Sequence, residues 1–251
     1  MVPAIAQDAT AVNPSGKVYL VGAGPGAVEL LTVKAHHLLT QAQVLVYDAL
    51  IDPAVLALVP PTCALHPVGK RGGQPSWPQA QIDELLVNLC QQGQSVVRLK
   101  SGDPFIFGRT ASEIQALKAA GCPFEVVPGL SSATVAPLLA SIPLTDPVWG
   151  SQFTVLTAHD LDQHNWEALA QMAVLVILMG ARALPEICDR LRRHGKRPET
   201  PVAIIRWASQ PQQQVWTGTL LNITQHTKGE QLSPCIIVIG EVVGLRPYLQ
   251  P

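Results

Sequence analysis

The sequence predicts an α/β protein made of two α/β domains with a cleft between them. Short runs rich in Val, Ile and Leu alternate with amphipathic segments, a pattern typical of mainly parallel sheets covered by helices on both faces. A segment rich in Pro, Gly and Ser near the middle of the chain indicates a linker between two such units. With 251 residues, 47% of them hydrophobic, the chain can bury a sizeable core.

Apolar runs on both sides of the linker predict the strands. They are residues 17–22, 44–48, 95–100, 124–127, 153–158, 173–179, 201–206 and 235–240. After the first run, residues 29–42 are expected to form a helix, because Leu31, Ala35, Leu38 and Ala42 fall on one face. A strand followed by an amphipathic helix is the repeating unit of an α/β domain.

The linker ASIPLTDPVWGSQ, residues 140–152, sets the expected domain organisation. We expect a flexible tail over residues 1–15, an N-terminal domain with a glycine loop over 16–145 and a C-terminal domain over 146–251. The first residues lack the charged and apolar regions of a signal peptide, and no run reaches the roughly 18 apolar residues of a membrane span. We therefore expect a cytoplasmic protein with no membrane partner.

Charge and cysteine usage exclude several classes of function. The net charge is −1, and the one basic run, residues 190–197, lies where a helix ends and complements its dipole, so we expect no nucleic-acid partner. The five cysteines are odd in number and never form a C-x-x-C pair, which indicates reduced thiols. His36 and His37 point to different faces of a helix, so we expect no metal site.

The turn after the first strand, VGAGPGA at residues 21–27, satisfies the G-x-G-x-x-G/A pattern of dinucleotide-binding proteins. Asp48 ends the next strand, where an acid that binds ribose would be expected, so these features alone favour NAD. Two residues argue against a pyrophosphate. Pro25 has no amide hydrogen to donate, and Glu29 places a negative charge where phosphates would lie. A tight turn without a ligand remains the plain alternative.

A second loop favours a different ligand. The stretch VVRLKSGDPFIFGR, residues 96–109, leads a strand directly into Ser-Gly-Asp-Pro. Such a turn presents backbone carbonyls and one carboxylate, which are acceptors and suit a cationic, amine-bearing ligand. S-adenosylmethionine, with its sulfonium and ammonium groups, is a ligand of this kind. A plain Asp-Pro turn is the alternative.

Several motifs together resemble one family. In chain order they are VGAGPG, LVYDAL, PVGKRGG, VVRLKSGDPFIFGR, FEVVPGLSSA, IPLT, LVILMG and TPVAII. Through them, residues 17–246 resemble the tetrapyrrole methylase family, in the order found in its uroporphyrinogen-III C-methyltransferases. The resemblance implies the tetrapyrrole methylase fold, a homodimer and no metal. It also implies methyl transfer from S-adenosylmethionine to C2 and C7 of uroporphyrinogen III, giving precorrin-2 for siroheme or cobalamin.

The resemblance also implies the site residues. Those expected to bind the cofactor are Gly24, Pro25, Ser101, Gly102, Asp103, Ile106, Ser131, Ser132, Met179 and Ala208. Asp48 matches the proposed proton acceptor and Lys70 the proposed proton donor, while Arg109 is implied to act in substrate handling or proton removal. The substrate carries carboxylates on every pyrrole ring, so cations in the cleft should hold it. The further candidates are Arg71, Arg98 and Lys100.

Plain structural roles compete with some of these assignments. Asp48 would cap the turn after its strand, Lys70 and Arg71 would be solvated loop cations, and Met179 would fill the core. Rival functions are a methylase of a later corrin precursor, an NAD-dependent oxidoreductase and a non-catalytic tetrapyrrole carrier.

The chain also departs from the family pattern at positions expected to face the substrate. The residues concerned are Ala49, Ser112, Asp146 and Ala158. These departures leave the methyl donor unaffected and bear on the acceptor and on the number of methyl groups added.

Overall fold

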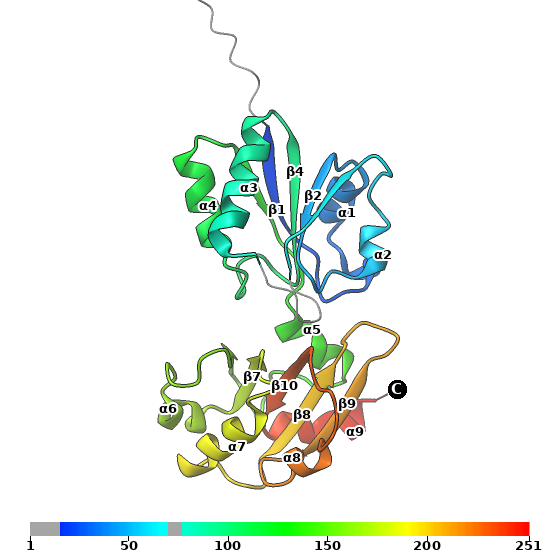
Figure 1. Cartoon of the computed structure of the whole chain (residues 1–251). Helices are drawn as coiled ribbons and strands as arrows, with labels where there is room; N and C mark the ends of the chain where they lie inside the picture. The colour runs from blue at the N-terminus through cyan, green and yellow to red at the C-terminus, as the bar shows by residue number, and fades with distance from the viewer. Residues whose placement is uncertain (1–15, 70–76, 251) are drawn as a thin grey trace, which may run out of the picture.

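The computed structural model describes residues 16–69 and 77–250. The predicted tail at 1–15 and two predicted site residues, Lys70 and Arg71, lie outside the described residues. Within them the chain forms two five-stranded sheets, each accompanied by helices, as Figure 1 shows. The α/β fold class predicted from the alternating apolar runs is confirmed.

The strands of the first sheet all run parallel, in the order β3-β2-β4-β1-β5. They are β1 (Lys17–Gly22), β2 (Val44–Tyr47), β3 (Ala64–Pro67), β4 (Ser95–Lys100) and β5 (Phe124–Val127). The helices of this half are α1 (Val33–Thr40), α2 (Pro53–Leu56), α3 (Gln79–Gln91) and α4 (Thr110–Ala119). Strands β4 and β1 are neighbours in this sheet. The chain leaves β1 toward β2 and leaves β4 toward β5, and these two strands lie on opposite sides of the β4-β1 pair. Open α/β sheets bind ligands where neighbouring strands connect in opposite directions.

The second sheet has the order β6-β7-β10-β8-β9, and of its pairings only β6 with β7 is parallel. Its strands are β6 (Phe153–Thr157), β7 (Val174–Leu178), β8 (Pro201–Arg206), β9 (Gln214–Thr219) and β10 (Cys235–Ile239). The helices of this half are α5 (Ser132–Leu139), α6 (Trp166–Gln171), α7 (Leu184–Arg193), α8 (Ile223–His226), η2 (Glu241–Leu245) and α9 (Arg246–Leu249).

The expectation of a mainly parallel sheet is wrong for this second half. Strands β8 and β10 are buried on both faces, so they form continuous apolar runs whichever way they point. Burial, not strand direction, sets the pattern that the sequence displays.

All the predicted apolar runs form strands, but β3 and β9 were not predicted. Both lie at the edge of their sheet, where one side of the strand has no neighbour. Most residues of β3 are exposed, and none of β9 is fully buried. An edge strand of this kind needs no continuous apolar run, which explains why the sequence pattern misses it.

The helix predicted over residues 29–42 is shorter and begins later. Residues Val28–Leu30 form a single 3-10 turn, and the α-helix α1 starts only at Val33. The side chain of Thr32 accepts a hydrogen bond from the amide of Ala35 and so caps α1 at that point. The glycine loop therefore does not lead directly into a helix N-terminus, as it does in a dinucleotide-binding unit.

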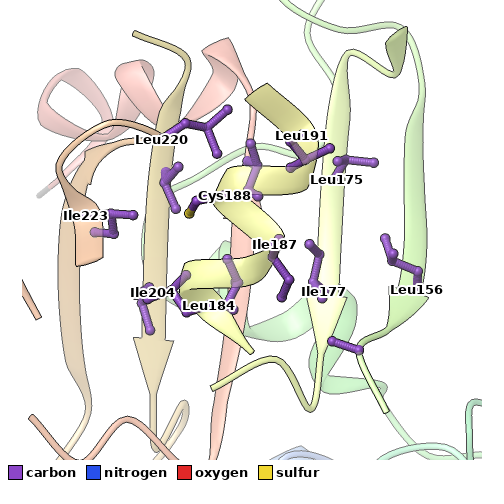
Figure 2. Packing of buried hydrophobic residues seen from close by; sticks show 14 of the residues in the cluster. Leu156, Leu175, Ile177, Leu184, Ile187, Cys188, Leu191, Ile204, Leu220 and Ile223 are labelled. Atoms are coloured by element: carbon purple, nitrogen blue, oxygen red, sulfur yellow. The ribbon is translucent and has the colours of Figure 1, made fainter. Parts of the chain in front are cut away.

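Alternate residues of the strands in the second sheet pack into two hydrophobic cores, one on each face of the sheet. Ile177 and Ile204 face the core beneath α7, which contributes Leu184 and Ile187, and Figure 2 shows these side chains interdigitating. On the opposite face of the sheet, residues such as Val176 pack with a second cluster. This alternation follows from the two-residue period of a strand.

Helix α5 connects the halves of the chain and lies between them in Figure 1. Its residues Ala133 and Ala136, together with Ile142 that follows, belong to the core on the face of the second sheet opposite α7. The helix precedes the predicted domain boundary at residue 145 but packs against β7 and β10. The division into domains at that residue stays a prediction.

Candidate active site

A cleft of about 1190 Å³ lies where the two halves of the chain meet. Residues that follow β1, β2 and β4 line it from the first half, and residues that follow β6, β7 and β8 line it from the second. The structure brings all the predicted cofactor-binding residues to this cleft: Gly24, Pro25, Ser101, Gly102, Asp103, Ile106, Ser131, Ser132, Met179 and Ala208. Predicted catalytic and substrate-binding residues also line it: Asp48, Arg98, Lys100 and Arg109.

The two ligand loops predicted from the sequence are hydrogen-bonded to each other. The amide of Gly24 donates to the carbonyl of Gly102 (3.2 Å), and the amide of Gly102 donates to the carbonyl of Gly24 (2.8 Å). Their backbones approach so closely that a Cβ on Gly22 would lie 2.6 Å from the Gly102 carbonyl oxygen. The glycines of the first loop thus serve the contact between backbones.

The glycine loop has few amides left for a phosphate. The amide of Ala23 donates to the Lys100 carbonyl (2.8 Å), and Pro25 has none. The amide of Ala27 donates to Ser209 Oγ (3.1 Å), a residue of the second half. Because the Gly24 amide is also used, as above, the loop does not form the cradle of N–H donors that a pyrophosphate requires. This geometry disfavours the NAD alternative.

The Ser-Gly-Asp-Pro loop presents acceptors to the cleft. Asp103 holds the turn through its carboxylate, which accepts from the amides of Phe105 (2.9 Å) and Gly129 (3.3 Å). Ser101 Oγ is buried and has no hydrogen-bond partner among the described residues. A buried hydroxyl without a partner beside a ligand cleft fits a polar ligand. These groups therefore fit the amine-bearing donor predicted from the loop.

The remaining predicted cofactor residues come from three other segments. Ser131 caps α5 by accepting from the amide of Ala133 (3.2 Å), and Ser132 begins that helix at the cleft. Met179 follows β7 with a positive φ of 57° and is 54% exposed, so the alternative that it fills the core is wrong. Ala208 follows β8 on the same wall.

A buried network of charges lies under the cleft. Arg98 Nη2 donates to Asp48 Oδ1 (2.6 Å), and Arg98 Nε donates to Glu113 Oε1 (2.9 Å). Lys100 Nζ donates to both carboxylate oxygens of Glu113, at 2.8 and 2.9 Å. The side chains of Arg98, Lys100 and Glu113 are 3%, 2% and 0% exposed, whereas that of Asp48 is 32% exposed. Asp48 is thus the member of the network that the cleft can reach.

Burial and charge act on this network in opposite directions. Burial lowers the pKa of Arg98, but the charges of Asp48 and Glu113 outweigh it, so the pKa lies above its ordinary value. Burial, followed by the charge of Arg98, lowers the pKa of Lys100, against the opposing effect of Glu113. Both cations are already compensated by acids of the protein. Their predicted contact with substrate carboxylates stays a prediction, and this pairing weakens it.

Among the described residues of the first half, Arg109 is the cleft-lining cation that remains available to a ligand. It has no ion pair within the described residues and is exposed. Both it and Phe107 have φ of 55°, in the left-handed region. Between them, a Cβ on Gly108 would lie 2.3 Å from the Pro104 carbonyl oxygen. Strained backbone of this kind concentrates at functional sites and fixes the direction of the side chain.

Sequence reasoning missed the cleft cations of the second half, namely Arg190, which is ion-paired with Asp162 and Glu186, and Arg182. Arg182 lines the cleft from the second half, is exposed, and forms no ion pair within the described parts of the chain. The available signal was its place three residues after Met179, in the loop that follows a buried strand. Glu113 was also missed as part of the site. Its partners lie on a distant strand, and the residues around Glu113 in the sequence do not indicate that its charge is buried there.

The departures from the family pattern have local structural consequences. Ser112 Oγ donates to the carboxylate of Asp83 (2.6 Å), which also accepts from the Gln79 side chain (2.8 Å). Asp146 caps a turn, since its carboxylate accepts from the amides of Val148 and Trp149. Ala49 and Ala158 line the cleft.

One cysteine thiol lies at the described cleft. Cys235 lines the cleft, but burial raises the pKa of its thiol to about 12, so it is not a thiolate nucleophile near neutral pH. Residues 16–69 and 77–250 contain no cluster of His, Cys, Asp or Glu suited to a metal ion. None of the helices in those ranges is long and apolar enough to cross a membrane.

Comparison with known families identifies the fold family. Residues 17–224 match the model described as Tetrapyrrole (Corrin/Porphyrin) Methylases. The chain belongs to the tetrapyrrole methylase family. The match extends from the first strand of the first sheet to α8 in the second half, and it includes the cleft-lining residues of both walls except 233–236.

Relatives within the tetrapyrrole methylase family are similar over most of the chain. A uroporphyrinogen-III C-methyltransferase of Synechococcus elongatus is 58% identical over 93% of this chain and 96% of its own length. A siroheme synthase of Acinetobacter baylyi is 45% identical over 94% of this chain, which spans 53% of that relative. A Thermus thermophilus uroporphyrin-III C-methyltransferase, solved with S-adenosylhomocysteine, is 37% identical over 92% of this chain and all of its own, with a TM-score of 0.80.

Proposed function

We propose that this protein is the S-adenosylmethionine-dependent methyltransferase that converts uroporphyrinogen III to precorrin-2 by methylation at C2 and C7. The observation that carries the proposal is the cleft, in which an acceptor-rich loop and a carboxylate held by an arginine meet. The 58% identical relative of Synechococcus elongatus is named a uroporphyrinogen-III C-methyltransferase, which supports the same substrate.

The donor-binding residues follow from the acceptors in the cleft. S-adenosylmethionine supplies an activated methyl group when bound. Asp103 and the carbonyl groups of its loop would accept from the ammonium group, and Ser101 would gain the partner that its buried hydroxyl lacks. Met179 and Ala208, on the opposite wall, would contact the donor from the second half. Because the donor is already activated, the protein contributes mainly alignment, which can supply about 7 to 11 kcal/mol of the barrier.

Asp48 takes the role of the base. A pyrrole carbon of the substrate attacks the methyl carbon, the bond from that carbon to the donor sulfur breaks, and positive charge develops on the tetrapyrrole. A proton must then leave the tetrapyrrole. The carboxylate of Asp48 lines the cleft and is partly exposed, which supports this role. Lys70, outside the described residues, remains the proposed proton donor.

Substrate carboxylates would be bound by cations that are free of internal partners. Arg109 from the first half and Arg182 from the second meet this condition within the described residues. Arg71, which lies outside them, completes the proposed set. Arg98 and Lys100 contribute less in this proposal, because Glu113 already compensates them.

An anaerobic assay with S-adenosylmethionine and freshly prepared uroporphyrinogen III tests the function. We expect the product to gain the mass of two methyl groups and the absorbance change of the corresponding dipyrrocorphin. Gain of one methyl group would restrict the activity to precorrin-1 formation. Donor binding without methyl transfer would contradict the assigned acceptor and point to a different tetrapyrrole.

We further propose a cytoplasmic homodimer. Exposed apolar side chains close together in the sequence support a second copy as partner: Leu138, Leu139, Val148 and Trp149. Light scattering coupled to size exclusion should give twice the mass of the 26.8 kDa chain. A monomeric mass at micromolar concentration would contradict the dimer.

A further inference from the structure

The charge network under the cleft is larger than the reaction itself requires. Methyl transfer needs one base, yet the protein buries Arg98, Lys100 and Glu113 beneath it. Buried ion pairs give little net stability compared with apolar residues of the same volume. Their presence at the floor of a catalytic cleft therefore calls for a role other than stability.

We propose that Arg98 is a positioning residue that fixes the Asp48 carboxylate for proton removal, with Glu113 and Lys100 holding the guanidinium in place. This inference rests on the proposed function and deepens it. It assigns Arg98 to the base instead of the substrate.

The guanidinium has no freedom to rotate. Its Nε donates to Glu113 (2.9 Å), its Nη2 to Asp48 (2.6 Å) and its Nη1 to the Leu99 carbonyl (3.2 Å). Three donors of one planar group thus bind three different acceptors. A planar fork in fixed contacts sets the direction of the carboxylate that it binds, which a lysine ammonium cannot do.

Neighbouring elements build this arrangement. Arg98 and Lys100 are two residues apart on β4, so they point to the same face of the sheet. Glu113 reaches them from the first turn of α4, and its carboxylate is fully buried between them. Two cations and two carboxylates therefore balance within the network, in which Arg98 pairs with Asp48 and Glu113, and Lys100 pairs with Glu113.

Asp48 is fastened by its backbone as well. It follows β2, which pairs with β4, and its amide donates to the Leu99 carbonyl (3.2 Å). That carbonyl also accepts from Arg98, so backbone and side chain of Asp48 are tied to one point on β4. With the arginine 3% exposed and the carboxylate 32% exposed, the pair presents only the acid to the cleft.

The test is Arg98→Met in the full-length protein, with kcat and both KM values measured against the wild type. We expect kcat to fall about 100-fold, because a misplaced catalytic group costs on that order. The KM values for S-adenosylmethionine and uroporphyrinogen III should stay within about twofold. Arg98→Lys, which keeps the charge but loses the fork, should rescue little of the loss.

A double variant separates positioning from general damage. In an Asp48→Asn background, Arg98→Met should lower kcat no further, since the group that it positions is already gone. A loss that multiplies with that of Asp48→Asn would overturn the proposal. So would a loss confined to the KM for uroporphyrinogen III, which would return Arg98 to direct substrate binding.

Lys196 provides the matched control. It is a buried cation that donates to the carbonyls of Ala170 (3.3 Å) and Met172 (2.6 Å) and does not line the cleft. Lys196→Met should lower stability without lowering kcat. An equal loss of kcat in this control would show that replacing any buried cation with methionine disturbs the enzyme, and would overturn the proposal.

A compensated variant covers the case in which Arg98→Met does not fold. Arg98→Met, Lys100→Met and Glu113→Gln together remove the fully buried charges of the network and leave only the Asp48 carboxylate, which is 32% exposed to water. This protein should fold, bind donor and retain the low kcat; full activity would overturn the proposal. If the wild type transfers no methyl group to uroporphyrinogen III, the proposed function itself fails and the positioning role falls with it.

Discussion

Two arginines on the walls of the same cleft have nearly the same hydrogen bonds and very different surroundings. Arg98, from the first sheet, bridges Asp48 and Glu113 at 2.6 and 2.9 Å. Arg190, from α7 in the second half, bridges Asp162 and Glu186, both at 2.6 Å. The Arg98 side chain is 3% exposed and that of Arg190 is 25% exposed. Distance alone therefore does not say what an ion pair contributes.

The difference extends to the two halves of the cleft. The first half contributes buried, compensated charges and the acceptor-rich loop, whereas the second contributes Met179, Ala208 and charges that water reaches. Water screens an exposed pair, while a buried charge depends on its partner almost completely. We therefore expect the proposed chemistry to be concentrated on the side of the parallel sheet, opposite the wall that the mixed sheet supplies.

The largest expected effect is on the free energy of unfolding, when one acid is removed from the Arg98 network or from the Arg190 network. Glu113→Gln leaves two buried cations facing one remaining carboxylate, and we expect it to lower the free energy of unfolding by about 3 to 5 kcal/mol. Glu186→Gln, the same change in the exposed network, should cost less than about 1 kcal/mol. Urea unfolding of both variants at pH 7 measures the difference. Equal losses of unfolding free energy in the two variants would contradict the distinction between the buried and the exposed network.

The next largest effect distinguishes donor binding by Asp103 from turnover by Arg109, two residues of the first half. Asp103→Ala should raise the Kd for S-adenosylmethionine about tenfold or more, because it removes a charged acceptor from the donor loop. Arg109→Ala should leave that Kd unchanged and lower turnover about 100-fold. Isothermal titration and single-turnover kinetics give the two quantities. Equal loss of donor binding in both variants would contradict this division.

A smaller effect tests the second half. Arg182→Ala should raise the KM for uroporphyrinogen III about fivefold, since an exposed cation contributes at most about 1 kcal/mol to a carboxylate contact. The Kd for the donor should not change. Lys118→Ala is the control, as Lys118 is exposed on α4 and does not line the cleft. If the control raises KM equally, the effect reflects net charge and not a contact.

The smallest effect concerns a surface network in the first half. Hydrogen bonds from Lys17 and Lys34 lower the pKa of Glu125 from 4.5 to about 2. A carboxyl whose pKa is lower in the folded state stabilises the fold above its unfolded pKa, and this contribution is lost as the pH falls through about 2. Glu125→Gln should therefore destabilise slightly at pH 7, and the difference should shrink below pH 4.5. A difference independent of pH would contradict this cause.

Much of the fold follows from the sequence because its inner strands are buried on both faces. The continuous apolar runs at residues 201–206 and 235–240 reveal this burial. They do not reveal that the two strands run antiparallel to each other. The edge strands β3 and β9 carry no such pattern. Strand direction and edge pairing depend on contacts between distant segments, which local composition does not encode.

The site was predictable where its residues lie in loops at strand ends, and less so where they lie underneath. Gly24 and Gly102 belong to separate motifs, and the structure brings their backbones into contact. The sequence predicts Arg98 and Lys100 as substrate cations because nothing local reveals Glu113 as their partner. That partner becomes visible only when the fold brings the Glu113 side chain of α4 to the side chains of β4.

The occupied amides of the glycine loop have a consequence for selective inhibition. In nucleotide-binding enzymes with a similar loop sequence, inhibitors gain affinity by placing anionic groups on free backbone N–H donors. Here the amides of Ala23, Gly24 and Ala27 already have acceptors within the protein. Phosphate mimics should therefore gain nothing at this cleft, whereas compounds with an amine directed at the Asp103 loop should discriminate in its favour.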